Sequence, residues 1–283
     1  MDNENERTAE IDEFWDKAGV QPVQIALPTG VGYTLRAYRM AETLPQQGED
    51  IDVDEDVDDA DTGDDLVTRI EGTDDPLRGL VRHDNRAENI DDDELDELDD
   101  EDTDEPPAED FEDKPTGAMT PEGEVPVFLS RRNKLLLFRT AEGLVSFVSS
   151  GTPNGLSFLK EWNSIATNLE PSHIAPHEDD SYELDLLVEN LRGGHDTWDP
   201  DLIISAGELA RDLGYALPIK DVLAALAPSS PLDELDEALR KSVDGGMGAM
   251  FARRRAKKVG AEQAALAWRT IIGKISAATN WRD

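Results

Sequence analysis

The sequence predicts an α+β protein: a small N-terminal antiparallel sheet with helices, a disordered acidic insert, and a mainly helical C-terminal part. Alternating apolar residues favour strands in the first half, and apolar residues at helical spacing dominate the second half. The segment 41–124 holds 35 acidic and 5 basic residues, so it contributes −30 to the formal net charge of −37. We therefore expect an α+β domain from residues 1–40 and 125–190, the insert at 41–124, and a helical domain at 191–283.

A helix and a β-hairpin are expected at the N-terminus. Apolar residues recur at helical spacing between Thr8 and Ala18, and Gly19 follows as a helix end. Two apolar runs, 23–27 and 33–40, then flank a Pro-Thr-Gly-Val-Gly turn, which is typical of a hairpin. We do not interpret these glycines as a dinucleotide-binding fingerprint, because its third glycine is absent and a strand pattern follows where a phosphate site needs a helix.

The acidic insert is predicted to be disordered. It has few aliphatic or aromatic residues and long runs of Asp and Glu, so burial cannot offset the entropy of an ordered chain. Two stretches with scattered apolar residues, 66–81 and 90–98, are either short motifs that fold on a partner or isolated apolar residues without a role. The Asp-rich run at 52–61 lacks the Gly and Glu positions of an EF-hand loop, so we expect only weak, non-specific cation binding.

Structure is expected to resume at residue 125. Two apolar runs, 125–129 and 135–139, predict a second hairpin joined by residues 130–134, which places the insert between strands of one four-stranded sheet. Apolar spacing predicts a short helix at 143–148 and a longer helix containing Trp162. A further strand-like run spans 182–187.

The C-terminal half is predicted to be mainly helical. Asp199 followed by Pro200 is typical of a capped helix start. We expect the buried faces of the helices to come from four apolar stripes, which span 202–213, 219–226, 232–243 and 261–278. A glycine-rich break at 245–248 separates the last two.

The sequence carries no recognisable catalytic motif. It has no cysteine, no P-loop and no Gly-x-Ser-x-Gly sequence, which argues against disulfides, thiolate chemistry, P-loop NTPases and serine hydrolases of that type. His173 and His177 are four residues apart, but Pro171 and Pro176 disfavour the helix that would bring both to one metal. We therefore expect no enzymatic activity, no cofactor and no metal site.

One dense basic cluster lies near the C-terminus. It allows three interpretations: a surface for phosphates or an acidic partner, a solvated helix start without a partner, or a target for the chain's own acidic insert. The acidic charge of the whole protein opposes direct contact with nucleic acid. The cluster consists of Arg253, Arg254, Arg255, Lys257 and Lys258.

Several segments of the expected folded part, taken in order, carry a family resemblance. They are the hairpin at 23–40, Val-Pro-Val-Phe-Leu at 125–129, Leu-Leu-Leu-Phe-Arg-Thr-Ala-Glu-Gly-Leu-Val-Ser-Phe-Val-Ser at 135–149, the Trp162 helix, Tyr-Glu-Leu-Asp-Leu-Leu-Val at 182–188, and Trp-Arg-Thr-Ile-Ile-Gly at 268–273. In this order they resemble SatS, an actinobacterial family of protein-export chaperones. The acidic insert departs from the family pattern.

The resemblance implies a non-enzymatic cytoplasmic chaperone. Such a protein binds exported preproteins through hydrophobic grooves in its C-terminal region and keeps them soluble before Sec-dependent export. A charged, disordered arm suits this role, because it keeps a protein with exposed apolar surface in solution. Carried over to this chain, the partner-binding residues would be Leu202, Leu209, Ile219, Leu223, Leu235, Leu239, Met247, Met250, Phe251, Trp268 and Ile272.

A second hypothesis assigns the function to the insert. An acidic regulator or nucleic-acid mimic would bind a basic partner protein through residues 41–124, in a salt-sensitive manner. Under either hypothesis we expect a cytoplasmic protein without a membrane span. No apolar run approaches the about 20 residues that a span needs, and the N-terminal residues lack the features of a secretory signal.

Overall fold

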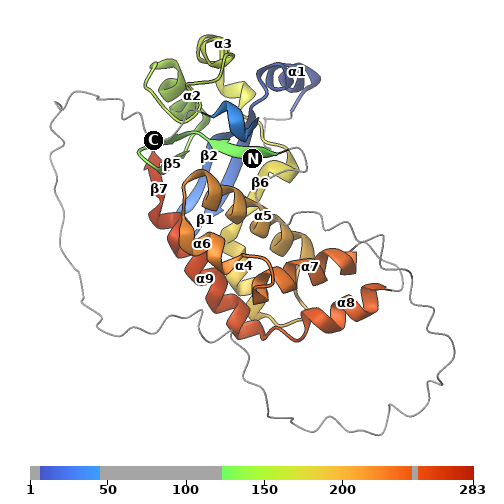
Figure 1. Ribbon diagram of the computed structural model, residues 1–283. Coiled ribbons are helices and arrows are strands. Elements are labelled where there is room, and N and C mark those ends of the chain that lie inside the picture. Colours follow the sequence, from blue (N-terminus) through green and yellow to red (C-terminus); the bar gives the residue numbers. More distant parts are fainter. Residues whose placement is uncertain (1–6, 45–122, 244–247) are drawn as a thin grey trace, which may run out of the picture.

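The structure, a computed structural model, describes residues 7–44, 123–243 and 248–283 (Figure 1). Most of the insert that we predict to be disordered therefore lies outside the described residues. At its two ends the prediction is wrong, because Ala41–Thr43 forms a 3₁₀ turn, η1, and Glu124 begins strand β3. Glu124 pairs with Met40 of the preceding strand, and the Ala41 N–H donates to the carbonyl of Gly123 at 3.3 Å, contacts of which side-chain composition gave no sign.

The predicted N-terminal helix and hairpin are confirmed. Helix α1, Ala9–Ala18, is capped by Thr8 and ends at Gly19, which has a positive φ of 58°. Strands β1, Gln21–Leu27, and β2, Gly30–Met40, pair antiparallel in one continuous register. The turn itself is Pro28-Thr29, so the prediction of Gly30 and Gly32 as turn residues is wrong: they lie in β2, opposite Leu27 and Ile25. Gly30 adopts a φ of 133° that only glycine takes without strain.

The second predicted hairpin is partly wrong. Strand β3, Glu124–Phe128, pairs with β2 rather than with β5, Lys134–Phe138. The hairpin partner of β5 is the short strand β4, Ser130–Arg131. The reason lies in the turn, where Arg132 and Asn133 have φ values of 51° and 58°. Two successive residues with positive φ make a tight two-residue turn, not the five-residue loop that we predicted.

The sheet is larger than the expected four strands, since the described residues contribute seven. Strand β6, Ser181–Glu183, adds parallel to β1, and strand β7, Thr279–Arg282, adds parallel to β5. The predicted strand at 182–187 stops at Glu183. Helix α4, Leu184–Arg192, follows because its buried leucines at 184, 187 and 191 have helical spacing.

Helices cover both faces of the sheet (Figure 1). Helices α1, α2 (Ala141–Ser149) and α3 (Trp162–Asn168) share a core with one face. The C-terminal helices share a core with the other face. Strand β5 illustrates the division, because Leu135 and Leu137 belong to the second core and Leu136 and Phe138 to the first. A run of four consecutive apolar residues is what a strand buried on both faces requires.

The C-terminal part is mainly helical, as predicted, so the predicted fold class is confirmed for the described residues. Asp199 caps α5, with Oδ1 accepting hydrogen bonds from the backbone N–H groups of Asp201 and Leu202. The short 3₁₀ turns η4 and η5 span Pro171–His173 and Glu178–Asp180. The helices are α5 (Pro200–Ala216), α6 (Lys220–Ala225), α7 (Pro231–Val243), α8 (Gly248–Ala256) and α9 (Ala261–Ala277).

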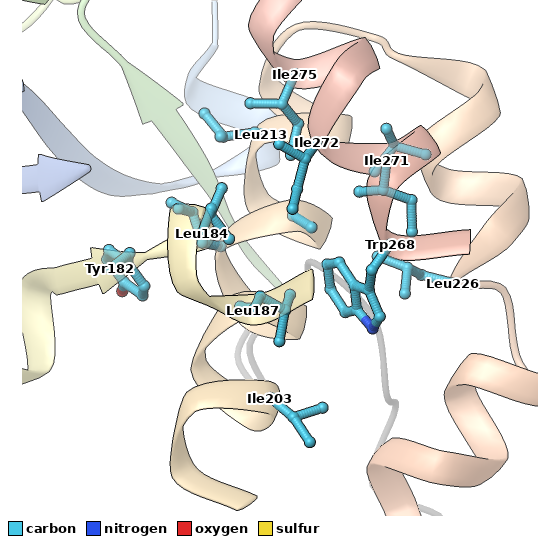
Figure 2. Close-up of a cluster of buried hydrophobic side chains, with 14 of the residues drawn as sticks. Tyr182, Leu184, Leu187, Ile203, Leu213, Leu226, Trp268, Ile271, Ile272 and Ile275 are labelled. Carbon is cyan, nitrogen blue, oxygen red and sulfur yellow. The ribbon is translucent and has the colours of Figure 1, made fainter. Parts of the chain in front are cut away.

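One apolar core joins these helices to the sheet. Trp268 points from α9 toward Leu187 of α4 and toward Leu226, which directly follows α6 (Figure 2). The domain boundary that we predicted between residues 190 and 191 falls inside α4, and the core continues on both sides of it. Within the described part of the chain, no helix has the length and hydropathy to cross a bilayer.

Candidate functional site

Helix α8 presents its small side chains to the interior. It packs against α7, and its buried residues are Ala252 and Ala256, which are four apart and so lie on one face. Ala249 on the same face is partly buried. Alanine methyl groups bury little area, so α8 is held to the molecule by a narrow apolar stripe.

The large apolar side chains of α8 point to solvent. Met250 is 64% exposed and Phe251 is 69% exposed. Val243, the last residue of α7, is 53% exposed, although we predicted it to continue the buried stripe of that helix. An amphipathic helix normally buries its largest apolar residues and exposes small or polar ones. The reversed arrangement on α8 is typical of a surface that a partner covers.

The predicted basic cluster occupies the same helix and the turn that follows it. All five cationic side chains are exposed. Arg255 lies 3.9 Å from Glu237 on α7, and Lys257 lies 3.2 Å from Asp196. Arg253, Arg254 and Lys258 form no ion pair with any residue that the structure describes. Exposed apolar and cationic side chains thus adjoin along one short helix, which we call the α8 surface: Met250, Phe251, Arg253, Arg254, Arg255, Lys257 and Lys258.

A second group of charged side chains lies in the interior, between the sheet and α5. Arg36 Nη2 donates to Asp180 Oδ1 at 2.6 Å, and Arg36 Nη1 donates to Tyr182 Oη at 2.9 Å and approaches Asp212 Oδ2 at 3.3 Å. The Tyr38 hydroxyl also donates to Asp212 Oδ2. These residues come from β2, η5, β6 and α5, so the network joins four elements that are distant in sequence.

Burial dominates the protonation of this network. It raises the pKa of Asp180 and of Asp212 above the usual value of 3.8, against the lowering effect of the Arg36 charge. Burial likewise raises the pKa of Tyr38, and the Asp212 charge raises it further. Burial lowers the pKa of Arg36, but the surrounding tyrosine and aspartate side chains raise it more. Each group therefore serves as a hydrogen-bond partner of another, which suits a structural network.

A third set of charged side chains links α5 to α7. Arg211 Nη2 lies 3.2 Å from Asp233 Oδ1, and Arg211 Nη1 lies 3.2 Å from Asp236 Oδ2. All three side chains are nearly fully buried. Arg240 Nε approaches Asp236 at 3.1 Å from the exposed side. Because Arg211 is shared by both carboxylates and is the cation that Asp233 pairs with among the described residues, this network is sensitive to the loss of Arg211.

A pocket of about 360 Å³ lies between α1 and α3, at the opposite end of the molecule from α8. Phe14 stacks on His173 there, with ring centroids 4.4 Å apart. His173 Nδ1 accepts a hydrogen bond from the backbone N–H of Glu170, so this histidine closes a turn. No cluster of three or more His, Asp or Glu side chains that could hold a metal ion occurs in the described ranges.

Comparison with known proteins identifies the family. A family model described as the SatS C-terminal domain matches residues 118–276, which is more than half of the chain. The chain belongs to the SatS C-terminal domain family. The resemblance to SatS that the sequence suggested is thereby confirmed, and no curated protein matches.

A solved structure supports the same conclusion for the fold. It is titled the crystal structure of the SatS C-terminal domain in complex with bromine, and it matches with a TM-score of 0.54. The match covers 95% of this chain and 97% of that chain at 18% sequence identity. At that identity the likeness establishes a shared fold with SatS.

The residues that the SatS resemblance implied as partner contacts differ in how exposed they are. Met250 and Phe251 lie together on the α8 surface, and Met247 lies outside the described residues. Leu202, Ile219 and Leu223 are partly buried against the core. The remaining five are core residues with at most 5% of their surface exposed: Leu209, Leu235, Leu239, Trp268 and Ile272.

A partner reaches the exposed pair directly, but it reaches the five core residues only if the core opens. The role of the buried residues as partner contacts therefore stays a prediction. Helical spacing placed each of them on an apolar face, and spacing alone does not tell which faces are covered by another helix. The buried network around Arg36 was missed altogether, because nothing in the local sequence links residues 144 to 176 positions apart.

Proposed function

We propose that the protein is a non-enzymatic chaperone or adaptor that binds exported preproteins in the cytoplasm and keeps them soluble before Sec-dependent export. The observation that carries the proposal is the outward-facing pair Met250 and Phe251 on α8, in a member of the SatS family. The client is an apolar segment of an unfolded preprotein, which lies against these two side chains.

The chemistry of the pair suits clients of varied sequence. Methionine is flexible and polarisable, so Met250 adapts its shape to different apolar side chains. Phe251 adds a large flat apolar surface. Full burial of such a side chain stabilises a complex by about 1.5–3 kcal/mol, so two partly exposed ones support weak and readily reversed binding. A protein that hands its client to an export machinery requires release of this kind.

The titratable groups support a role without a catalytic step. The carboxylates and tyrosines whose pKa is raised, Asp180, Asp212, Tyr38 and Tyr182, are all hydrogen-bonded around Arg36 in the interior. Displaced pKa values occur both in active sites and in structural ion-pair networks. Here the groups satisfy one another, which favours the structural interpretation.

The experiment measures aggregation of an unfolded exported precursor by light scattering, with and without the purified full-length protein. We expect the wild type to suppress aggregation and the double variant Met250→Ser, Phe251→Ser to lose most of that suppression. The matched control is Leu186→Ser, which removes a half-exposed apolar side chain elsewhere, on α4. A wild type that neither suppresses aggregation nor binds the precursor would sink the proposal, and so would a double variant that works as well as the control.

A second proposal assigns the function to the acidic insert, and it rests on the net charge of −30 over residues 41–124. In that case the protein is an acidic regulator that binds a basic partner protein. Binding would be tight at low salt and would weaken steeply as salt is added, because exposed charges are screened. The double variant at Met250 and Phe251 would bind that partner like the wild type, which separates the two proposals.

A further inference from the structure

We propose that the α8 surface binds the chain's own acidic segment, residues 45–122. This contact goes beyond the proposed function, because it is a contact within one molecule and holds whether or not the protein binds preproteins. The proposal rests on three features: unpaired cations on α8, exposed apolar side chains beside them, and a segment of matching chemistry that is long enough to reach them.

The cations of α8 differ from the other charged side chains on the surface. Lys17 pairs with Glu13 at 2.6 Å and Arg192 pairs with Glu189 at 3.0 Å. Other exposed cations, such as Lys160 and Lys220, have no carboxylate partner among the described residues, but they are isolated in the sequence. On α8, Arg253 and Arg254 are consecutive, and neither forms an ion pair with a described residue. An unpaired row of cations in an acidic chain is an attractive target for an acidic segment.

The segment supplies the complementary charge. Residues 45–122 hold 33 acidic and 5 basic residues, a net charge of −28. Eight acidic residues lie between 91 and 100, together with Leu95 and Leu98. This stretch therefore offers many carboxylates with two apolar side chains among them. The α8 surface offers guanidinium groups next to Met250 and Phe251, so the two match in charge and in hydrophobicity.

The length of the segment allows the contact. It leaves the described structure after Leu44 and returns at Gly123, which makes 78 residues. Half of that length spans about 130 Å when extended, whereas a folded part of this size measures about 45 Å across. Because both ends are tethered, the segment is present near α8 at an effective concentration on the order of millimolar, so a weak contact is enough.

A second basic surface provides a control. Arg131, Arg132 and Lys134 lie at the β4–β5 turn, but the Lys134 ammonium already donates to the carbonyl of Ala277 at 2.6 Å. The described structure gives this turn no exposed apolar pair of the kind that α8 carries. If charge alone attracted the segment, both surfaces would bind it. If charge and apolar contact act together, α8 is preferred.

The experiment uses the full-length chain and takes advantage of its lack of cysteine. A nitroxide label is attached to Asp96→Cys, and the loss of amide signal intensity along the ¹⁵N-labelled chain is measured by NMR. We expect the amides of residues 249–258 to lose intensity at about 0.05 M salt and to regain it at about 0.5 M salt, where charges are screened. The charge reversal Arg253→Glu, Arg254→Glu, Arg255→Glu should abolish the loss.

Further variants test whether the signal loss comes from the α8 surface. The matched reversal Arg131→Glu, Arg132→Glu, Lys134→Glu should leave the α8 signal loss unchanged, and Met250→Ser, Phe251→Ser should reduce it. Signal loss that only the β4–β5 reversal removes overturns the proposal, as does an α8 that keeps full intensity at low salt. Contact between two molecules is tested with a mixture of ¹⁵N-labelled chains that carry no nitroxide and nitroxide-bearing chains that carry no ¹⁵N. Signal loss on α8 in that mixture as strong as within one chain also overturns the proposal. These readouts are independent of preprotein binding.

Discussion

Helices α5 and α8 differ in whether their charged side chains are buried or exposed. On α5 the neighbouring residues Arg211 and Asp212 are both nearly fully buried, and each pairs with residues of other elements. On α8 the three consecutive arginines at 253–255 are exposed. Charged side chains therefore link α5 to other elements of the fold, whereas those on α8 remain accessible to a partner.

The geometry of a helix explains how α5 joins two sides of the molecule. Consecutive residues differ in direction by about 100°, so Arg211 and Asp212 point to different neighbours. Arg211 holds the carboxylates of α7, and Asp212 meets Arg36 and Tyr38 of the sheet. A single dipeptide thus ties the helical part to the sheet, and its charges are costly to leave unpaired.

The largest effect that tests this comparison is the loss of Arg211. We expect Arg211→Ala to lower the free energy of unfolding by about 3–5 kcal/mol, because Asp233 stays buried without a cation, keeping only the backbone N–H of Ser229, and Asp236 keeps only Arg240. Urea denaturation followed by tryptophan fluorescence measures it. The matched change on α8, Arg253→Ala, should shift stability by less than about 0.5 kcal/mol. Equal losses in the two variants would remove the distinction between the helices.

A smaller effect concerns the pH dependence of stability. Because burial raises the pKa of Asp212, the folded state holds its proton to a higher pH than the unfolded state does. The stability from this group is therefore fully present below the unfolded-state pKa of about 4 and is lost as pH rises through the raised folded-state pKa. Asp212→Asn should flatten this part of the profile, as measured by urea midpoints between about pH 4 and pH 7. Identical profiles for wild type and variant would contradict the assignment.

The smallest effect is expected on the α8 surface. Met250→Ser combined with Phe251→Ser should change the free energy of unfolding by at most about 0.5 kcal/mol, since both side chains already lie in solvent. On α7, by contrast, Leu235→Ala should cost about 2–5 kcal/mol, because Leu235 is 1% exposed. Thermal unfolding of the three proteins compares them directly. A large loss in the double variant would mean that the pair belongs to the core.

The local sequence pattern predicted much of the fold. The β1–β2 hairpin followed from two apolar runs around a glycine-containing turn, and α9 followed from apolar residues at helical spacing, with Trp268 and Ile272 among them. These features depend on residues close in sequence, whose preferences act before any distant contact forms. The basic cluster was also evident, because it is five cations within six residues.

The sequence by itself determined the β1–β2 hairpin, the apolar faces of most helices, the position of the acidic segment, and the residues that gather cations and apolar groups near the C-terminus. Tertiary structure alone decided that β6 and β7 join the sheet as parallel strands, that Arg36 is buried beside Asp180 and Asp212, and that Trp268 is covered while Phe251 is not. The physical reason is that periodicity reports which face of an element is apolar. What covers that face depends on segments that are distant in the sequence, which no local pattern records.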